Sequence, residues 1–296
     1  LITFWSLVKI DFKSTLKSIP FLALILIWIA LLSFSFYYAT NRIEVYGSPY
    51  PTTDLLLGLI IELLPIFGLL LVVFYSGELV WKTRSYKFNG IIDATPVQNS
   101  VFFGSKLAVL TLIPMVLILL SLLTGVAFQL MRGYLELNIP LYLSTFYYGG
   151  LQLMLYVIFC IFVQSMVSNK YLGMVISGLV IFLFGPLSES IGLEHPLLLF
   201  NNIPSMARAY SDFTDYGHYI SKFNWLGVHW SIFSVLLMLL SYKFWKRGLA
   251  KGFKVKTNWS LTEKVLIGSL LLLFSTSGGF IFYNTNIVNE YETSDE

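Results

Sequence analysis

Residues 55–75 read LLLGLIIELLPIFGLLLVVFY, and nearly every position before Tyr75 is Leu, Ile, Val or Phe. A helix needs about 20 apolar residues to cross the hydrocarbon core of a bilayer, so this stretch predicts a membrane span. Its one charged residue is Glu62. A carboxylate at the centre of a span costs about 2.5 to 3.5 kcal/mol, whereas each Leu, Ile, Val or Phe contributes about −0.3 to −0.6 kcal/mol. The apolar majority outweighs the carboxylate, so the span inserts with Glu62 inside it.

The whole chain has the same character. Of its 296 residues 56% are hydrophobic and 12% are charged, whereas a soluble domain carries roughly 25% charged residues. The mean hydropathy is +0.75. The composition excludes an ordinary soluble enzyme, a disordered segment and a nucleic-acid binder. We expect an all-α polytopic helical bundle whose partner is the lipid bilayer, with no nucleic acid bound.

Seven apolar stretches are long enough to be considered as spans, and the fifth is the shortest. They are Ile19–Tyr38, Leu55–Tyr75, Leu107–Leu130, Leu141–Val167, Tyr171 to about Pro186, Trp225–Phe244 and Val265–Tyr283. Residues 1–17 are amphipathic, with Lys9, Lys13 and Lys17 on one helical face. They predict an interfacial elbow helix, although a ragged start of the first span is the alternative. Because the chain opens with Leu1, we expect a piece of a longer protein.

The basic residues predict the orientation of the spans. When the connections are assigned to alternate sides of the membrane, fifteen Lys and Arg residues fall on one side and only Arg42, Arg132, Arg208 and Lys222 on the other. Cytoplasmic connections carry the excess of Lys and Arg. The prediction is therefore a cytoplasmic N-terminus, a basic cytoplasmic linker at 249–264, and an extracytoplasmic acidic tail at 284–296.

The connection between the second and third spans carries the most informative pattern. It reads GELVWKTR over 77–84 and NGIIDATPV over 89–97, and GSK follows at 104–106. We expect a helix that extends the second span into the cytoplasm, then a break, a short helix with an apolar Ile91-Ile92 tip, and a stop at Pro96. Such a short amphipathic helix suits docking into a groove of a partner. From physical reasoning alone, an ordinary basic loop is an equal alternative.

This block resembles the signature region of type-2 ABC exporter permeases, and the order of elements over roughly residues 1–250 is also similar to that family. The resemblance implies a six-span permease half at 18–248 that couples to a separate cytoplasmic ABC ATPase and works with a second permease half, in the same or a fused chain. ATP and Mg would belong to the ATPase, so no cofactor is expected in this chain. The implied ATPase-coupling residues are Glu78 and Arg84 on the stalk, and Asn89, Gly90, Ile91, Ile92, Asp93, Thr95 and Pro96 in a coupling helix at about 89–96.

The predicted external segment at 187–224 contains Glu194, His195, Asp212 and His218. Together with the end of the chain, it resembles bacterial fusion proteins in which an ABC permease half precedes an extracytoplasmic zinc aminopeptidase of the gluzincin class. That resemblance implies the bacterial inner membrane, a seventh bridging span at 265–283, and a peptidase domain that would follow in the full-length protein. The zinc motif of such peptidases needs two His four residues apart on one helix. No pair among His195, His218 and His229 has that spacing, so we expect no catalytic or metal-binding residue here and assign these side chains hydrogen-bonding roles. The minor alternative is a metal site on the external segment, formed by Glu194, His195, Asp212, Asp215 and His218.

Two hypotheses for the function follow. In the first, the chain is a transport module without enzymatic activity of its own, and Glu62 lies on the translocation path as a substrate or proton contact. In the alternative, the chain anchors an external metallopeptidase without transport. For Glu62 itself, the alternative to a substrate or proton contact is pairing with Gln152, Gln164 or a facing subunit, whichever function holds. The coupling segment discriminates between the two, because an anchor has no use for a docking helix.

Overall fold

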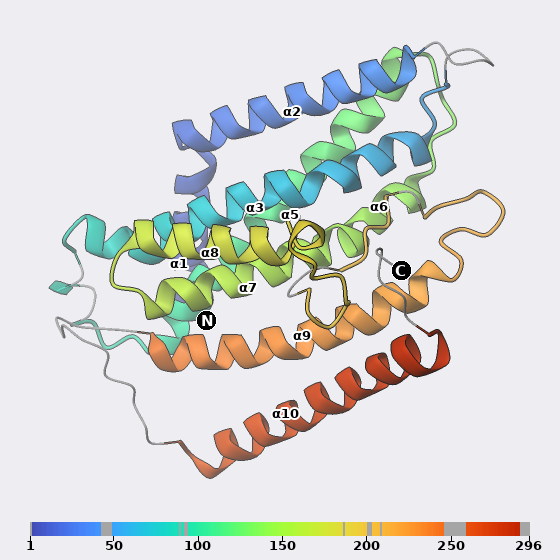
Figure 1. Cartoon of the computed structure of the whole chain (residues 1–296). Helices are drawn as coiled ribbons and strands as arrows, with labels where there is room; N and C mark the ends of the chain where they lie inside the picture. Colours follow the sequence, from blue (N-terminus) through green and yellow to red (C-terminus); the bar gives the residue numbers. More distant parts are fainter. Residues whose placement is uncertain are drawn as a thin grey trace. The chain divides into compact units, whose positions relative to one another are not determined.

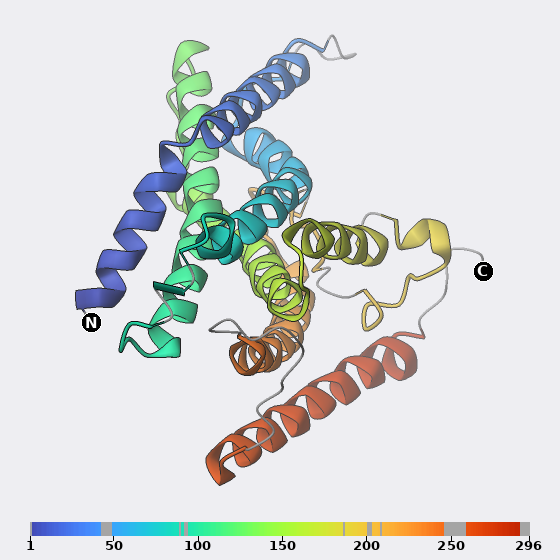
Figure 2. The ribbon, with the colours of Figure 1, turned by 90° about the vertical axis from the view of Figure 1, so that its left-hand side faces the viewer.

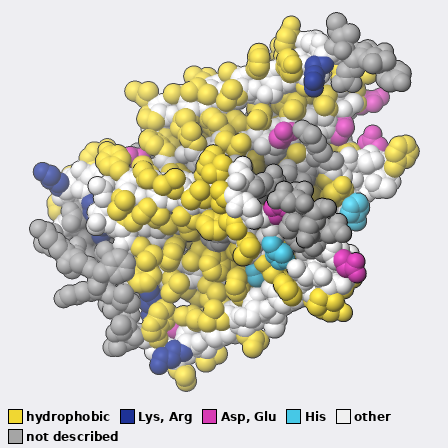
Figure 3. All heavy atoms as spheres, in the orientation of Figure 1, with side chains coloured by type: hydrophobic (Ala, Val, Ile, Leu, Met, Phe, Trp, Pro, Cys, Tyr) yellow, Lys and Arg dark blue, Asp and Glu magenta, His cyan; other side chains and the backbone are white. Residues whose placement is uncertain are grey.

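The computed structural model describes residues 2–42, 49–88, 90–91, 94–185, 187–199, 203–207, 209–245 and 259–290. Every regular element in these ranges is a helix, and the single β-bridge joins Ser211 to Asp215 (Figure 1). The all-α membrane bundle predicted from the sequence is confirmed. On the face in Figure 3, hydrophobic side chains cover the helices, as lipid contact requires.

The helices follow the predicted order. They are α1 (Ile2–Leu16), α2 (Ile19–Thr40), α3 (Thr53–Ser85), α5 (Asn99–Met131), α6 (Ile139–Tyr148), α7 (Gly150–Met166), α8 (Lys170–Phe184), the 3-10 helix η1 (Glu189–Ile191), α9 (Tyr219–Phe244), α10 (Leu261–Phe282) and the π-helix η2 (Tyr283–Val288). Within the described ranges, six helical segments are long and apolar enough to cross a membrane, with α6 and α7 counted together. The remaining apolar helix is α8, whose 15 residues extend about 23 Å.

The elbow is a separate helix. Helix α1 ends at Leu16. Ser18 then caps α2, because its side chain accepts a hydrogen bond from the Phe21 N–H. Pro20 stands in the first turn of α2, where its missing N–H is not needed. Figure 2 shows α1 turning away from the direction of α2. Lys9, Lys13 and Lys17 are exposed, while the opposite face buries Val8, Asp11 and Thr15.

The chain divides into two compact units. The first unit comprises Leu1–Val72, Ala108–Met154 and Ser205–Tyr219, and the second comprises Val73–Leu107, Leu155–Pro204 and Ile220–Glu296. Of the domain boundaries predicted from the sequence, most of the basic linker and the end of the external tail lie outside the described residues. The start of the predicted tail, residues 284–288, lies in the π-helix Tyr283–Val288, which continues α10.

The core of the first unit is built around Trp28, which is 1% exposed. Its indole Nε1 donates a hydrogen bond to Ser121 Oγ at 2.8 Å, and its ring stacks on Phe67 with centroids 4.7 Å apart. Ser121 Oγ in turn donates to the Leu117 carbonyl. The tryptophan thus ties α2 to α5 by a polar bond and to α3 by an aromatic contact.

We predict that Trp28→Phe and Ser121→Ala destabilise the protein, and that their effects are not additive. Both remove the same bond between helices, which is worth about 1 kcal/mol in a membrane protein. A double-mutant cycle measured by unfolding in denaturing detergent should therefore return a coupling of about 1 kcal/mol. Strictly additive single effects would contradict this assignment.

Candidate functional site

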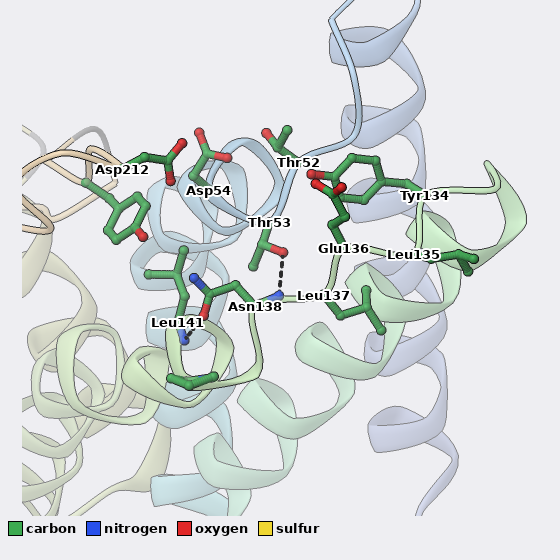
Figure 4. Close-up of a pocket in the computed structure, with 12 residues that line it drawn as sticks. Thr52, Thr53, Asp54, Tyr134, Leu135, Glu136, Leu137, Asn138, Leu141 and Asp212 are labelled. Atoms are coloured by element: carbon green, nitrogen blue, oxygen red, sulfur yellow. Dashed lines mark hydrogen bonds between the residues drawn. The ribbon is translucent and has the colours of Figure 1, made fainter.

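A cavity of about 610 Å³ opens in the first unit (Figure 4). We call it the outer cavity, after the side of the membrane on which the sequence predicts these connections to lie. Its walls come from the start of α3, the connection between α5 and α6, the start of α6, and the external segment. The lining residues are Thr52, Thr53, Asp54, Tyr134, Leu135, Glu136, Leu137, Asn138, Pro140, Leu141, Tyr210 and Asp212.

Local backbone chemistry places the α5–α6 connection across the start of α3. Helix α5 ends at Met131. Two residues later, Gly133 has a φ of 74°, in the left-handed region, and the Tyr134 N–H donates back to the Gln129 carbonyl. This pattern is the glycine-terminated helix end. Asn138 then caps α6 by accepting from the Leu141 N–H, and its own N–H donates to Thr53 Oγ1 at 3.2 Å. The connection is therefore fixed at both ends, with Glu136 between them.

The side chains that line the outer cavity give it a negative charge. Asp54, Glu136 and Asp212 line it, and none of its lining residues is Lys or Arg. Partial burial, and then the charge of Glu136, raise the pKa of the Tyr134 phenol. Burial and then Asp212 raise the pKa of Tyr210. Both phenols therefore stay neutral at physiological pH, and the cavity favours a cation over an anion.

The external segment forms one wall of this cavity. Tyr216 is 5% exposed and its hydroxyl hydrogen-bonds to Ser144 Oγ at 3.1 Å, while its ring lies 4.3 Å from that of Tyr148. The bridge between Ser211 and Asp215 closes a short loop that carries Asp212. Asp212 is thus the member of the four predicted external residues that lines the outer cavity.

The other predicted external residues do not line the outer cavity. His218 stacks on Tyr219 in the first unit, whereas Glu194 and His195 belong to the second unit. Within the part of the chain that the structure describes, no three His, Cys, Asp or Glu side chains come together so that they could hold a metal ion.

Glu62 lies in a second cavity of the first unit, about 360 Å³ in volume. The other lining residues are Ala39, Arg42, Pro49, Asp54, Leu55, Gly58, Leu59, Ala207 and Tyr210. The two cavities share Asp54 and Tyr210. Because Glu62 follows Thr53 by nine residues, it lies about 14 Å along α3 from the first residue of that helix. The carboxylate is therefore placed beside a cavity that also holds Arg42.

The predicted stalk lies in the second unit, where α3 continues ten residues beyond Tyr75 to Ser85. Lys170 Nζ at the start of α8 lies 2.7 Å from Glu78 Oε1. Trp81 Nε1 donates to Gln164 Oε1 of α7 at 2.8 Å. The stalk is thus connected to both helices by polar contacts. Sequence reasoning identified Glu78 but missed Trp81 as the residue that reaches α7.

Glycines allow these helices to approach closely. A Cβ on Gly173 of α8 would lie within 3 Å of the Gln164 amide, and one on Gly77 of α3 would overlap the end of Met174. Small residues at such positions are typical of helix contacts in membranes. The stalk, α7 and α8 therefore pack at a distance that larger residues would not permit.

The end of the stalk is well defined. Arg84 lies over the Trp81 ring, 4.9 Å from its centroid. Helix α3 ends in a Schellman motif, in which the Phe88 N–H donates to the Thr83 carbonyl and the Lys87 N–H to the Arg84 carbonyl. Lys87 occupies the left-handed position with φ 58°, where glycine is usual.

The predicted coupling helix is described in part. Gly90 and Ile91 are helical, and Ile91 is 68% exposed. Thr95 and Pro96 lie in a bend before α5, so they are not part of a helix. Asn89, Ile92 and Asp93 lie outside the described residues. The described part exposes several apolar side chains next to the stalk. Two of them, Phe88 and Ile91, we call the stalk tip.

We predict that Gly58→Ala displaces the external segment from the first unit. A Cβ at this position would come within 2.6 Å of the Ala207 carbonyl oxygen, so the backbone must move. Met206→Cys, at a position that is 2% exposed, should then react faster with a maleimide than it does with Gly58 intact. Gly178→Ala is the matched control, because a Cβ there meets nothing within 4 Å. Equal labelling in the two alanine variants would contradict the prediction.

We also predict that Lys87→Gly stabilises the protein by about 1 kcal/mol, since a left-handed residue with a Cβ costs roughly that amount. Lys82→Gly, inside α3, should destabilise the protein by about 1 kcal/mol instead. Denaturing-detergent titrations of both variants check the pair. A loss of stability in Lys87→Gly would refute the assignment of this helix end.

Comparison with protein-family models, with curated proteins and with solved structures gives no match. The functional argument for this chain therefore rests on its sequence and on the two sites described above.

Proposed function

We propose that this chain is one transmembrane half of an ATP-driven transporter of the exporter type, powered by a cytoplasmic ABC ATPase on a separate subunit that holds ATP and Mg. The chain is a multi-pass membrane protein, and the residues that the structure describes form six helices capable of spanning the bilayer. Beyond that, the proposal rests on the resemblance of residues 77–106 to the permease signature and on the geometry of the stalk. A bacterial inner membrane and a cytoplasmic N-terminus are part of the proposal.

The observation that carries the proposal is the braced stalk. A helix transmits a push from a motor subunit only if it is held against the rest of the bundle. Here Trp81 is bonded to α7 and Glu78 to α8, just before the helix ends. Hydrogen bonds between membrane helices contribute about 0.6 to 2 kcal/mol each. A movement of the stalk tip would therefore reach α7 and α8 through direct bonds.

The two cavities of the first unit fit the same proposal as parts of a path. Transport would proceed by alternating rearrangement of this half against a second one, in the same or a fused chain. Glu62 lines the smaller cavity, where it would contact the substrate or a proton. Carboxylates inside a membrane span are typical of translocation paths. Asp54 and Tyr210 line both cavities, so a solute in the outer cavity lies beside the same residues that border Glu62.

The alternative is a membrane anchor that displays an extracytoplasmic metallopeptidase and transports nothing. Such an anchor needs membrane spans but no motor. It would tolerate the loss of the Trp81 and Glu78 contacts and of the exposed stalk tip without functional consequence. The two proposals therefore differ in whether a nucleotide-hydrolysing subunit binds at residues 88–91.

The deciding experiment is purification of the full-length protein from its native membranes in a mild detergent, followed by detection of a bound ATPase subunit and its ATP hydrolysis. We predict that the intact protein retains the subunit. In Ile91→Asp, the amount of ATPase subunit that co-purifies should be lower by a factor of at least about ten. A carboxylate buried in an apolar groove costs more than the about 1.4 kcal/mol that a tenfold change represents.

Phe213→Asp is the matched control, because Phe213 is also an exposed apolar residue, 97% accessible, but lies in the predicted external segment and lines neither cavity. It should retain the ATPase as the intact protein does. Both variants should elute at the same volume in size-exclusion chromatography, which separates a docking defect from misfolding. Absence of an ATPase from all three preparations would contradict the transport proposal and favour the anchor.

A further inference from the structure

Helix α1 has a positively charged face that makes no ion pair within the described part of the chain. Lys9, Lys13 and Lys17 follow one another at intervals of four residues, so they lie along one side of the helix. The Lys17 N–H still donates to the Lys13 carbonyl, so Lys17 continues the same face. All three lysines are exposed, and the ion pairs of the described residues do not involve them. The one acidic residue of α1, Asp11, is 5% exposed and lies on the opposite face.

Large apolar side chains are exposed on the same side of α1 as the lysines. Trp5 is 61% exposed, Ile10 is 63% exposed and Ile2 is 86% exposed. Exposed apolar side chains that lie together mark an interaction surface. Their combination with lysines is typical of a helix in a membrane interface, where the apolar groups enter the acyl region and each lysine extends its ammonium group toward the headgroups.

The position of α1 in the chain places this face at the membrane surface. Only Lys17 and Ser18 separate α1 from α2, which is one of the helices long and apolar enough to cross a membrane. Figure 2 shows that α1 does not continue the direction of α2. The 15 residues of α1 extend about 22 Å. A helix of this length that turns away from the end of a span runs along the bilayer surface.

We propose that the exposed face of α1 binds the headgroups of anionic phospholipids. The ammonium groups of the three lysines attract lipids that carry a net negative charge more strongly than zwitterionic lipids. Each lysine near such a surface contributes about a fivefold preference. Lys9 and Lys17 are separated by about 12 Å along the helix, so the face offers an extended row of charges, which fits a layer of headgroups rather than one small anion.

The apolar neighbours of the lysines favour lipid over an acidic soluble protein as the partner. Trp5 and Ile10 need an apolar environment beside the charged one, and the bilayer that surrounds α2 supplies both within the length of one side chain. This inference goes beyond the proposed transport function, because a transporter and a membrane anchor would both keep α1 at the surface.

The test places a fluorophore on the lysine face and measures which lipid lies next to it. Ser6 is exposed and precedes Lys9 by three residues, so Ser6→Cys in a Cys160→Ala background carries the label. The full-length protein is reconstituted in phosphatidylcholine nanodiscs with rising fractions of a brominated lipid, which quenches the fluorophore on contact. Brominated phosphatidylglycerol should give half-maximal quenching at a mole fraction at least about 20-fold lower than brominated phosphatidylcholine. In 1 M salt, where the screening length is about 3 Å, this ratio should fall.

Two variants separate charge from structure. In Lys9→Gln/Lys13→Gln, the ratio should drop to about fivefold or less, because one lysine remains. Glutamine has nearly the helix propensity of lysine, so α1 stays helical. Lys9→Arg/Lys13→Arg keeps both charges and should keep the ratio of the parent protein.

The matched control is Lys222→Gln/Lys264→Gln, which removes the same net charge from two exposed lysines of the second unit. It should keep the ratio of the parent protein. Equal quenching by the two brominated lipids in the parent protein would overturn the proposal and leave an acidic protein surface as the partner of this face. A ratio that survives in Lys9→Gln/Lys13→Gln would overturn it as well. None of these outcomes bears on the binding of an ATPase at the stalk tip.

Discussion

In a membrane, a buried polar side chain has no water to bond to, and the satisfaction of one such residue, Gln129, fixes the first unit. Gln129 is fully buried near the end of α5. Its Nε2 donates to the Pro51 carbonyl and to Thr53 Oγ1, and its Oε1 accepts from the Tyr142 hydroxyl at 2.6 Å. An unsatisfied amide in an apolar environment costs several kcal/mol, so these partners cannot separate freely. Gln129 thus ties the ends of α3, α5 and α6 together beside the outer cavity.

A second buried glutamine plays the same role in the second unit. Gln164 is 2% exposed near the end of α7; it accepts from Trp81 of the stalk and donates to the Lys170 carbonyl at the start of α8. The glycine at position 173 is the steric condition for this arrangement, because any side chain there would collide with the amide. Each candidate site thus rests on an amide that can donate and accept at once, which a carboxylate or an ammonium cannot do.

Sequence reasoning succeeds where the physical signal is local and fails where it is tertiary. The spans follow from the length of each apolar run, and the separate elbow from Ser18 and Pro20, because both are properties of neighbouring residues. The extension of α3 to Ser85 was expected from the GELVWKTR pattern. By contrast, Gln129 and Trp81 resemble ordinary residues near helix ends. Their partners are distant in the sequence, and no neighbouring residue predicts those contacts. Glu62 was recognised as unusual, but its cavity depends on the Ala207 backbone crossing Gly58, a contact between residues far apart in sequence.

The weak burial of α10 changes what a single hydrogen bond can do. Between helices in lipid there is no hydrophobic driving force, so packing and polar contacts supply the association energy. In the segment Ile139–Met166, 61% of the apolar 18-residue stretch is buried, whereas only 6% of the corresponding stretch at α10 is buried. Losing one bond from the former removes a small part of its contacts, whereas α10 depends on a few directional contacts along its length. A helix held in this way keeps its position while those contacts are intact and changes position when one is removed. That makes α10, rather than the tightly packed helices, the element whose position is most sensitive to the loss of a single polar contact.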